Sequence, residues 1–281
     1  MHVLILGAGY VGRPLADSLQ ASGHRTTCWV RSEESAEKLR ASGHAVVVGD
    51  LGDDWVWRGL VDDWDAVVFC ASSSGGGPEA YQEIYGKALR LALSRARGAG
   101  RFVYTSSTSV YGQDDGSLLT ETDPAVSADP KSRVLQDAEE SVVAAWGTVL
   151  RLSGIYGPSR AIYWTRYVLG GAVPPGDPDR WVNMIHRDDA VSAIRHVLQC
   201  PETAGQIYNT TDDEPVRLTD LLAWLRERHP GGMVPMSSST VAKSRKATSK
   251  RISNKKLRDS GWEPLYPTFR EGYQGLMANG G

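Results

Sequence analysis

Residues 3–12 read VLILGAGYVG, so that four apolar residues run directly into a turn with three glycines. The apolar run is typical of a buried strand, and the amphipathic stretch over residues 12–21 is typical of a helix. In a strand–turn–helix of this kind, Gly7 permits the tight turn, Gly9 lets the backbone approach a pyrophosphate, and Gly12 lets the helix pack closely on the strand. The helix N-terminus then offers free N–H groups and the positive end of its dipole to phosphates. The segment, including Tyr10 and Val11, therefore predicts a dinucleotide site.

Short apolar runs alternate with amphipathic stretches through the first half of the chain. We expect strands over residues 3–6, 26–30, 45–48, 66–70, 101–105 and 148–152, and helices over 12–21, 33–41, 79–97 and 131–145. Near-continuous Val, Leu and Ile in the strands is typical of a parallel sheet covered on both faces. The predicted fold class is α/β, a Rossmann-type doubly wound parallel sheet.

The regular alternation of apolar runs and amphipathic stretches does not continue in the second half of the chain. Residues 157–178 are rich in Gly, Pro and aromatics, which favours a substrate-facing segment, and helices are expected over 188–199, 218–228 and 268–278. A short strand is expected over 206–209 and a polar loop over 230–250. Residues 1–155 are thus predicted to form the dinucleotide-binding domain, and 156–281 a small substrate-binding lobe with elements that return to the main sheet.

The ends of the next strands bear on the type of nucleotide. The second strand ends at Arg31 and Ser32, where an acidic residue would accept from the ribose hydroxyls of NAD. A guanidinium suits the 2′-phosphate of NADP, so we predict NADP, with NAD less favoured; an exposed surface arginine is the alternative. Further cofactor contacts are expected at the ends of the third and fourth strands, from Asp50, Leu51, Ala71 and Ser72.

Composition excludes several classes of protein. The chain has 281 residues, 41% of them hydrophobic, and a net charge of −2, which gives no overall attraction to nucleic acid or anionic membranes. Its three cysteines are far apart and its six histidines are scattered, so neither a disulfide framework nor a metal site is predicted. No signal peptide or membrane span is recognised, and a cytoplasmic location is expected.

The stretch Tyr104-Thr105-Ser106-Ser107-Thr108-Ser109-Val110-Tyr111-Gly112 resembles the extended short-chain dehydrogenase/reductases, the group of nucleotide-sugar epimerases and dehydratases. The resemblance continues through RLSGIYGP (residues 151–158), VNMIHRDD (182–189) and GQIYN (205–209). It implies that Ser107 contacts the substrate oxygen that gains or loses a proton. It also implies that Tyr156 borders the nicotinamide and that Asn183 and His186 face the substrate. A structural histidine is the alternative at position 186.

Two features depart from the family's pattern. The Gly7-x-Gly9 spacing is tighter than usual, and it also occurs in UDP-glucose dehydrogenases, which need a catalytic cysteine in a later domain; Cys200 lacks that context. More important, the family's Tyr-x-x-x-Lys dyad is absent. The tyrosine position aligns with Lys131 or Ser132, and the lysine position with Leu135 or Gln136, in a segment without tyrosine. The chain therefore resembles an epimerase-like bacterial branch of the family that lacks this dyad.

Three explanations for the missing dyad stay open. Another group supplies the proton, namely Lys131, Tyr156, His186 or a water held by Ser107 and Thr108. Alternatively, the substrate needs little proton assistance, as in reduction of an iminium or an activated alkene. In the third explanation the protein binds NADP(H) without turnover and acts as a redox-responsive regulator.

Two groups of residues are expected in the substrate lobe. Residues 243–258 contain no acidic residue and eight basic ones: Lys243, Arg245, Lys246, Lys250, Arg251, Lys255, Lys256 and Arg258. They are read as a solvated basic loop or as a site for a substrate phosphate or carboxylate, held by Arg251 and Lys250. Aromatic residues suggest a wall for a ring-shaped substrate, with helical packing as the alternative: Tyr163, Trp164, Tyr167 and Trp181.

The sequence thus favours an NADP-dependent oxidoreductase or epimerase that acts on a carbinol or carbonyl carbon of a sugar-like or other small polar metabolite. Its alternative is the silent NADP(H)-binding regulator. The expected partner is a small-molecule substrate, phosphorylated or carboxylated, with no nucleic acid and no membrane. A homodimer through the helices over 79–97 and 131–145 is a further possibility.

Overall fold

A computed structural model describes residues 1–60, 63–228 and 248–278 of the chain. Its centre is a parallel sheet of seven strands in the order β11-β7-β5-β4-β1-β2-β3. The strands are β1 (His2–Leu6), β2 (Arg25–Val30), β3 (Ala45–Val48), β4 (Ala66–Phe69), β5 (Arg101–Ser107), β7 (Thr148–Leu152) and β11 (Ile207–Thr210). The order reverses between β1 and β4, which is where ligands of doubly wound sheets bind. The α/β fold class is confirmed.

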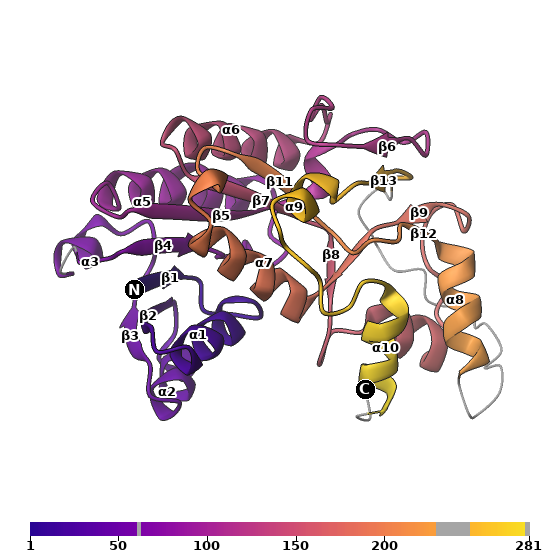
Figure 1. Ribbon diagram of the computed structural model, residues 1–281, viewed down its shortest axis with the longest axis horizontal. Coiled ribbons are helices and arrows are strands. Elements are labelled where there is room, and N and C mark those ends of the chain that lie inside the picture. Colours follow the sequence, from indigo (N-terminus) through magenta and orange to yellow (C-terminus); the bar gives the residue numbers. More distant parts are fainter. Residues whose placement is uncertain (61–62, 229–247, 279–281) are drawn as a thin grey trace.

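Helices cover both faces of this sheet (Figure 1). One face packs against α1 (Gly12–Ala21), α2 (Glu33–Ala41) and α7 (Arg187–Gln199), and the other against α3 (Asp54–Arg58), α4 (Pro78–Tyr81), η1 (Gln82–Ala88), α5 (Leu89–Arg95) and α6 (Pro130–Ala144). Because both faces are covered, the strand residues between them are buried whichever way they point. This explains the continuous apolar runs in the sequence.

A smaller lobe lies to the right of the sheet in Figure 1. It contains short strand pairs, β8 (Gly154–Tyr156) with β10 (Met184–His186) and β9 (Trp181–Val182) with β12 (Val216–Arg217). Its helices are the π-helix η3 (Tyr163–Leu169), α8 (Leu218–Glu227) and α10 (Phe269–Ala278), which share a third apolar core. A last pair joins β6 (Leu118–Leu119) to β13 (Arg251–Ile252). The remaining short helices are η2 (Thr108–Val110), η4 (Pro201–Thr203) and α9 (Lys255–Asp259).

Two expected elements differ in the structure. β5 continues two residues beyond the expected end, to Ser107, and the helix expected over 79–97 consists of α4, the π-helix η1 and α5. The polar loop expected over 230–250 lies outside the described residues except for 248–250, and so do Lys243, Arg245 and Lys246.

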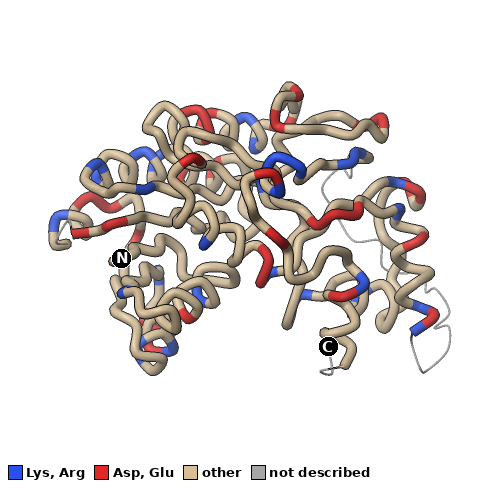
Figure 2. The backbone as a smooth tube through the Cα atoms, viewed as in Figure 1, with Lys and Arg blue, Asp and Glu red and all other residues tan. Residues whose placement is uncertain are grey.

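The described chain has neither a large region of one charge sign nor a long apolar helix. In Figure 2, basic and acidic residues are mixed over the described chain. None of the described helices is both long and apolar enough to cross a membrane. Likewise, no group of three or more His, Cys, Asp or Glu in the described part of the chain is placed to hold a metal ion.

Candidate functional site

A cavity of about 1160 Å³ opens at the carboxyl ends of the sheet strands, between the sheet and the lobe. The ends of β1, β2, β4 and β5 form one part of its wall, and residues of β8, β9 and the segment before β13 form the other. Drug-sized ligands occupy pockets of roughly 300–1,000 Å³, so this cavity accommodates a larger ligand or two ligands side by side.

The glycine turn forms the inner end of this cavity. Gly7, Gly9, Tyr10 and Val11 line it, whereas Gly12 lies behind them at the start of α1. Gly7 has φ +97°, and a Cβ there would overlap the backbone of Ala71. A Cβ on Gly12 would overlap the carbonyl oxygen of Gly7, so α1 and β1 are packed as closely as the sequence predicts.

The turn also suits a pyrophosphate. A Cβ built on Gly9 meets no atom within 4 Å, so the backbone here faces open space. No side chain caps the N-terminus of α1, where Val11 occupies the N-cap position. Because Gly9, Tyr10 and Val11 line the cavity, the positive end of the dipole of α1 lies beside it, as an anionic dinucleotide requires.

The predicted adenosine contacts fall into two groups. Arg31, Ser32, Leu51, Ala71 and Ser72 line the cavity. The Arg31 guanidinium is exposed and donates to Ser74 Oγ at 3.2 Å. Asp50 is not among the lining residues; its Oδ1 accepts from the Gly52 N–H at 2.7 Å, so the carboxylate shapes the loop after β3.

Hydroxyl groups follow one another along the end of β5. Thr105, Ser106, Ser107, Thr108 and Ser109 all line the cavity. Ser107 Oγ accepts from the Ser109 N–H at 3.2 Å and caps the 3₁₀ turn η2. Among the described residues its own hydroxyl proton has no acceptor, so that proton is available for the predicted contact with a substrate oxygen.

Two of the residues expected at the reacting centre lie elsewhere. Tyr156 is 2% exposed and stacks on Tyr273 of α10 at 4.8 Å between ring centroids, because β8 turns this side chain into the lobe core. His186 is 3% exposed, and its Nδ1 accepts from the Asp188 N–H at the start of α7. Burial lowers the pKa of His186 to about 4, so the ring is neutral near pH 7. Neither residue is among those that line the cavity, so the structure does not bring them together with Ser107 as the family resemblance suggests.

Lys131 is also outside the cavity. Its Nζ lies over the ring of Tyr81, 5.4 Å from the centroid, at the first turn of α6. Its neighbour Ser132 donates to the Ser109 carbonyl at 2.8 Å, and Gln136 Nε2 donates to the Val110 carbonyl at 3.1 Å. Side chains at the positions of the missing dyad therefore fix the turn after β5 rather than entering the cavity.

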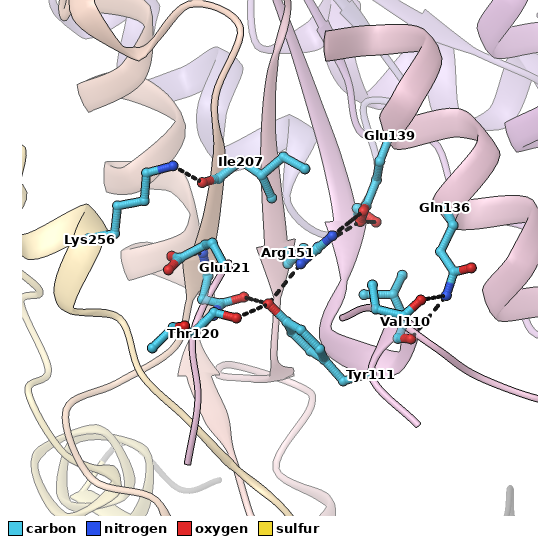
Figure 3. A network of polar contacts seen from close by, with 12 residues as sticks. Val110, Tyr111, Thr120, Glu121, Gln136, Glu139, Arg151, Ile207 and Lys256 are labelled. Carbon is cyan, nitrogen blue, oxygen red and sulfur yellow. Dashed lines mark hydrogen bonds and ion pairs between the residues drawn. The ribbon is translucent and has the colours of Figure 1, made fainter. Parts of the chain in front are cut away.

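A buried polar network supports the hydroxyl-bearing strand from behind (Figure 3). Arg151 Nη2 and Glu139 Oε2 are 2.7 Å apart, with side-chain exposures of 5% and 3%. Ser106 donates to Glu139 Oε1 at 2.5 Å, and Arg151 Nη1 donates to the hydroxyl of Tyr111 at 2.7 Å. The Tyr111 hydroxyl itself lies 2.9 Å from Asn209 Oδ1. The network thus joins β5, α6, β7 and β11 under the site.

The lobe contributes cations and aromatic rings. Of the residues expected there, Asn183, Tyr163, Trp181 and Lys250 line the cavity, together with Arg160 and Arg180. Trp164 packs in the lobe core. Arg251 donates to the Gly116 carbonyl at 2.9 Å and lies over the Trp181 ring, so its neighbour Lys250 is the cation that reaches the cavity.

Sequence reasoning missed several lining residues, among them Arg160, Arg180 and Tyr85. Arg180 is 8% exposed, and its Nη1 donates to the carbonyls of Pro175 and Asp177 at 2.9 Å. Arg160 follows the Gly157-Pro158 turn, and Tyr85 lies in the π-helix η1. Position next to a recognised motif was a signal for Arg160; none in the sequence pointed to Arg180 or Tyr85.

Comparison with known proteins agrees with this geometry. The model of the "NAD dependent epimerase/dehydratase family" matches residues 3–210. Protein YeeZ of Escherichia coli (strain K12) is 34% identical over 218 residues, which cover 74% of this chain and 76% of YeeZ. A 2-alkyl-3-oxoalkanoate reductase of Stenotrophomonas maltophilia (strain K279a) is 28% identical over 256 residues, 79% of this chain and 74% of the reductase. A solved epimerase/dehydratase-type structure from Methylobacillus flagellatus is 30% identical, with a TM-score of 0.81 over 99% of this chain and 98% of its own.

Proposed function

Because this chain belongs to the NAD-dependent epimerase/dehydratase family of extended short-chain dehydrogenases/reductases, we propose that it is an NADP-dependent oxidoreductase or epimerase acting on a carbinol or carbonyl carbon of a small polar metabolite. The observation that carries this proposal is that the glycine turn, the hydroxyls of β5 and cations of the lobe line the same cavity. A bound nicotinamide dinucleotide supplies or accepts the hydride in such chemistry.

The residues of the chain divide the remaining tasks. The N-terminus of α1 and the backbone of Gly9 would hold the pyrophosphate. The hydroxyl of Ser107 would donate to the substrate oxygen, and the network behind β5 keeps that strand end in place. Arg160, Arg180 and Lys250 favour a substrate that carries a phosphate or carboxylate, since no Asp or Glu is present among the described residues that line the cavity. The reductase from S. maltophilia, whose name specifies a 3-oxo acid, supports testing carboxylate substrates first.

The first test measures binding and turnover separately. NADPH and NADH are titrated into the purified protein by nucleotide fluorescence, followed by 2-alkyl-3-oxo acids, sugar nucleotides and simple ketones. We expect tight NADPH binding and oxidation by one class of carbonyl compound. Ser107→Ala is expected to lower turnover by about 10²–10³-fold, as loss of one donor to a developing oxyanion does, with unchanged NADPH affinity. NADPH binding without turnover across the panel would favour the regulatory alternative, and no binding would overturn the nucleotide site.

Arg31 provides the test of nucleotide preference. Arg31→Ala is expected to weaken NADPH binding by about 10–100-fold, because a hydrogen bond to a charged group contributes about 1.5–3 kcal/mol, while NADH affinity changes little. The matched control is Ser74→Ala, which removes the described hydrogen-bond partner of Arg31 without removing the charge. Equal wild-type affinities for the two nucleotides, unchanged in Arg31→Ala, would contradict the NADP preference.

A further inference from the structure

Lys250 is a buried amine on the wall of the cavity. It is 6% exposed, and its Nζ donates to the Tyr111 carbonyl at 2.6 Å and to Thr248 Oγ1 at 2.8 Å. An ammonium group has three N–H donors, so two are engaged within the protein and one is left for a ligand. No carboxylate of the described residues is within ion-pair distance of Nζ.

The two hydrogen bonds place Lys250 beside the strand that carries Ser107. Its acceptor Tyr111 immediately follows η2, and η2 begins directly after Ser107. On the lobe side, the amide of Asn183 donates to the Lys250 carbonyl at 2.8 Å and accepts from the Ile252 N–H at 2.8 Å. Lys250 is therefore fixed from both sides, and it lines the same cavity as Ser107 and Asn183.

The surroundings of Lys250 favour loss of its proton. Burial lowers its pKa to about 8, and Asp114, whose Oδ1 accepts from the Ser249 N–H, opposes this shift only in part. The other cations that line the cavity are Arg31, Arg160 and Arg180, and Arg251 lies over the Trp181 ring. A guanidinium does not release its proton in a protein, so Lys250 is the cation here that exchanges one near neutral pH.

We propose that Lys250 is the proton donor that replaces the missing tyrosine, which rests on the function proposed above. In carbonyl reduction the hydride adds to the carbonyl carbon, and the electron pair of the C=O π bond moves to oxygen. The proton from the Lys250 ammonium forms the new O–H bond, and the neutral amine then takes a proton from water. Oxidation of the carbinol runs through the same steps in reverse, with the neutral amine as base.

Variants at position 250 test the proton transfer. For reduction, wild-type kcat should fall as the pH rises through about 8, because the donor must be protonated. Lys250→Met is expected to lower kcat by about 10²–10⁴-fold with no break near that pH, since this is the usual contribution of acid–base assistance. Lys250→Arg keeps the charge without a transferable proton, so its kcat should be as low as that of Lys250→Met. Lys255→Met, at an exposed lysine paired with Asp259, is the matched control.

A readout independent of turnover uses the wild-type protein. Trace acetylation with acetic anhydride at increasing pH, read by mass spectrometry, reports the titration of each lysine. Lys250 is expected to titrate near pH 8, well below the usual range of a lysine, and NADPH should slow its labelling. Titration of Lys250 like an ordinary surface lysine would overturn the proposal.

The outcomes separate the two proposals. If Lys250→Met retains more than one tenth of the wild-type turnover, the role of Lys250 is overturned but the oxidoreductase function is not. The same holds if the pH profile of this variant still breaks near pH 8. Absence of wild-type turnover on every compound overturns the oxidoreductase function and this step with it. NADPH affinity and the thermal unfolding midpoint of Lys250→Met are measured alongside, so that misfolding is recognised.

Discussion

Glu139→Ala is expected to lower the free energy of unfolding by about 3–5 kcal/mol, because it leaves the buried guanidinium of Arg151 without its carboxylate. The same substitution removes the acceptor of the Ser106 hydroxyl. Loss of that contact loosens the strand end that carries Ser107. Urea unfolding followed by circular dichroism measures the change in free energy.

The control for this prediction is an ion pair of the same charge type at the surface. Lys255 and Asp259 are one helical turn apart, with side-chain exposures of 77% and 60%, and Asp259→Ala is expected to cost about 0–1 kcal/mol. If Glu139→Ala costs no more than this control, the network does not stabilise the fold in the way that its burial implies.

Gly12→Ala is expected to weaken NADPH binding by at least about 10²-fold, equivalent to about 2.7 kcal/mol. The added Cβ would overlap the Gly7 carbonyl and lie 2.9 Å from Cys70 Sγ, so α1 must move away from β1. The N-terminus of α1 would then no longer be placed to bind the pyrophosphate. Gly98→Ala, where a Cβ meets nothing within 4 Å, is the matched control and should bind as the wild type does. Fluorescence titration decides between them, and full affinity in Gly12→Ala would show that the helix N-terminus does not hold the nucleotide.

The sheet and its helices were predictable because their signals are local. A strand buried on both faces needs a continuous apolar run, and this run is visible without knowledge of its neighbours. The end of β5 was harder to place, because Ser106 and Ser107 have the composition of a loop. Their strand geometry depends on pairing with Arg151 and Leu152 of β7. The π-helical turn η1 also escaped prediction, since apolar periodicity over one turn does not distinguish it from an α-helix.

In the candidate site, too, contiguous motifs were predictable and contacts between distant segments were not. The turn from Gly7 to Gly12 is contiguous, so the sequence alone indicated its role. Tyr156 and His186 belong to recognisable motifs, but the direction in which β8 and β10 turn their side chains is a tertiary property. The sequence suggested for Lys250 only a place in a solvated basic loop or an anion contact beside Arg251. Its approach to Tyr111 depends on the pairing of β13 with β6, which joins segments more than a hundred residues apart.

That pairing also sets the order in which the site is assembled during synthesis. Lys250 follows Ser107 by 143 residues, and ribosomes add roughly 5–20 residues per second, so the two residues emerge about 7–30 s apart. The glycine turn and the hydroxyl-bearing strand end therefore exist in the nascent chain before the amine that faces them. A chain halted before residue 250 would have the loop that meets the nucleotide but no ammonium in the cavity. The proposed proton donor is thus added to the chain only after the glycine turn and the end of β5 have been synthesised.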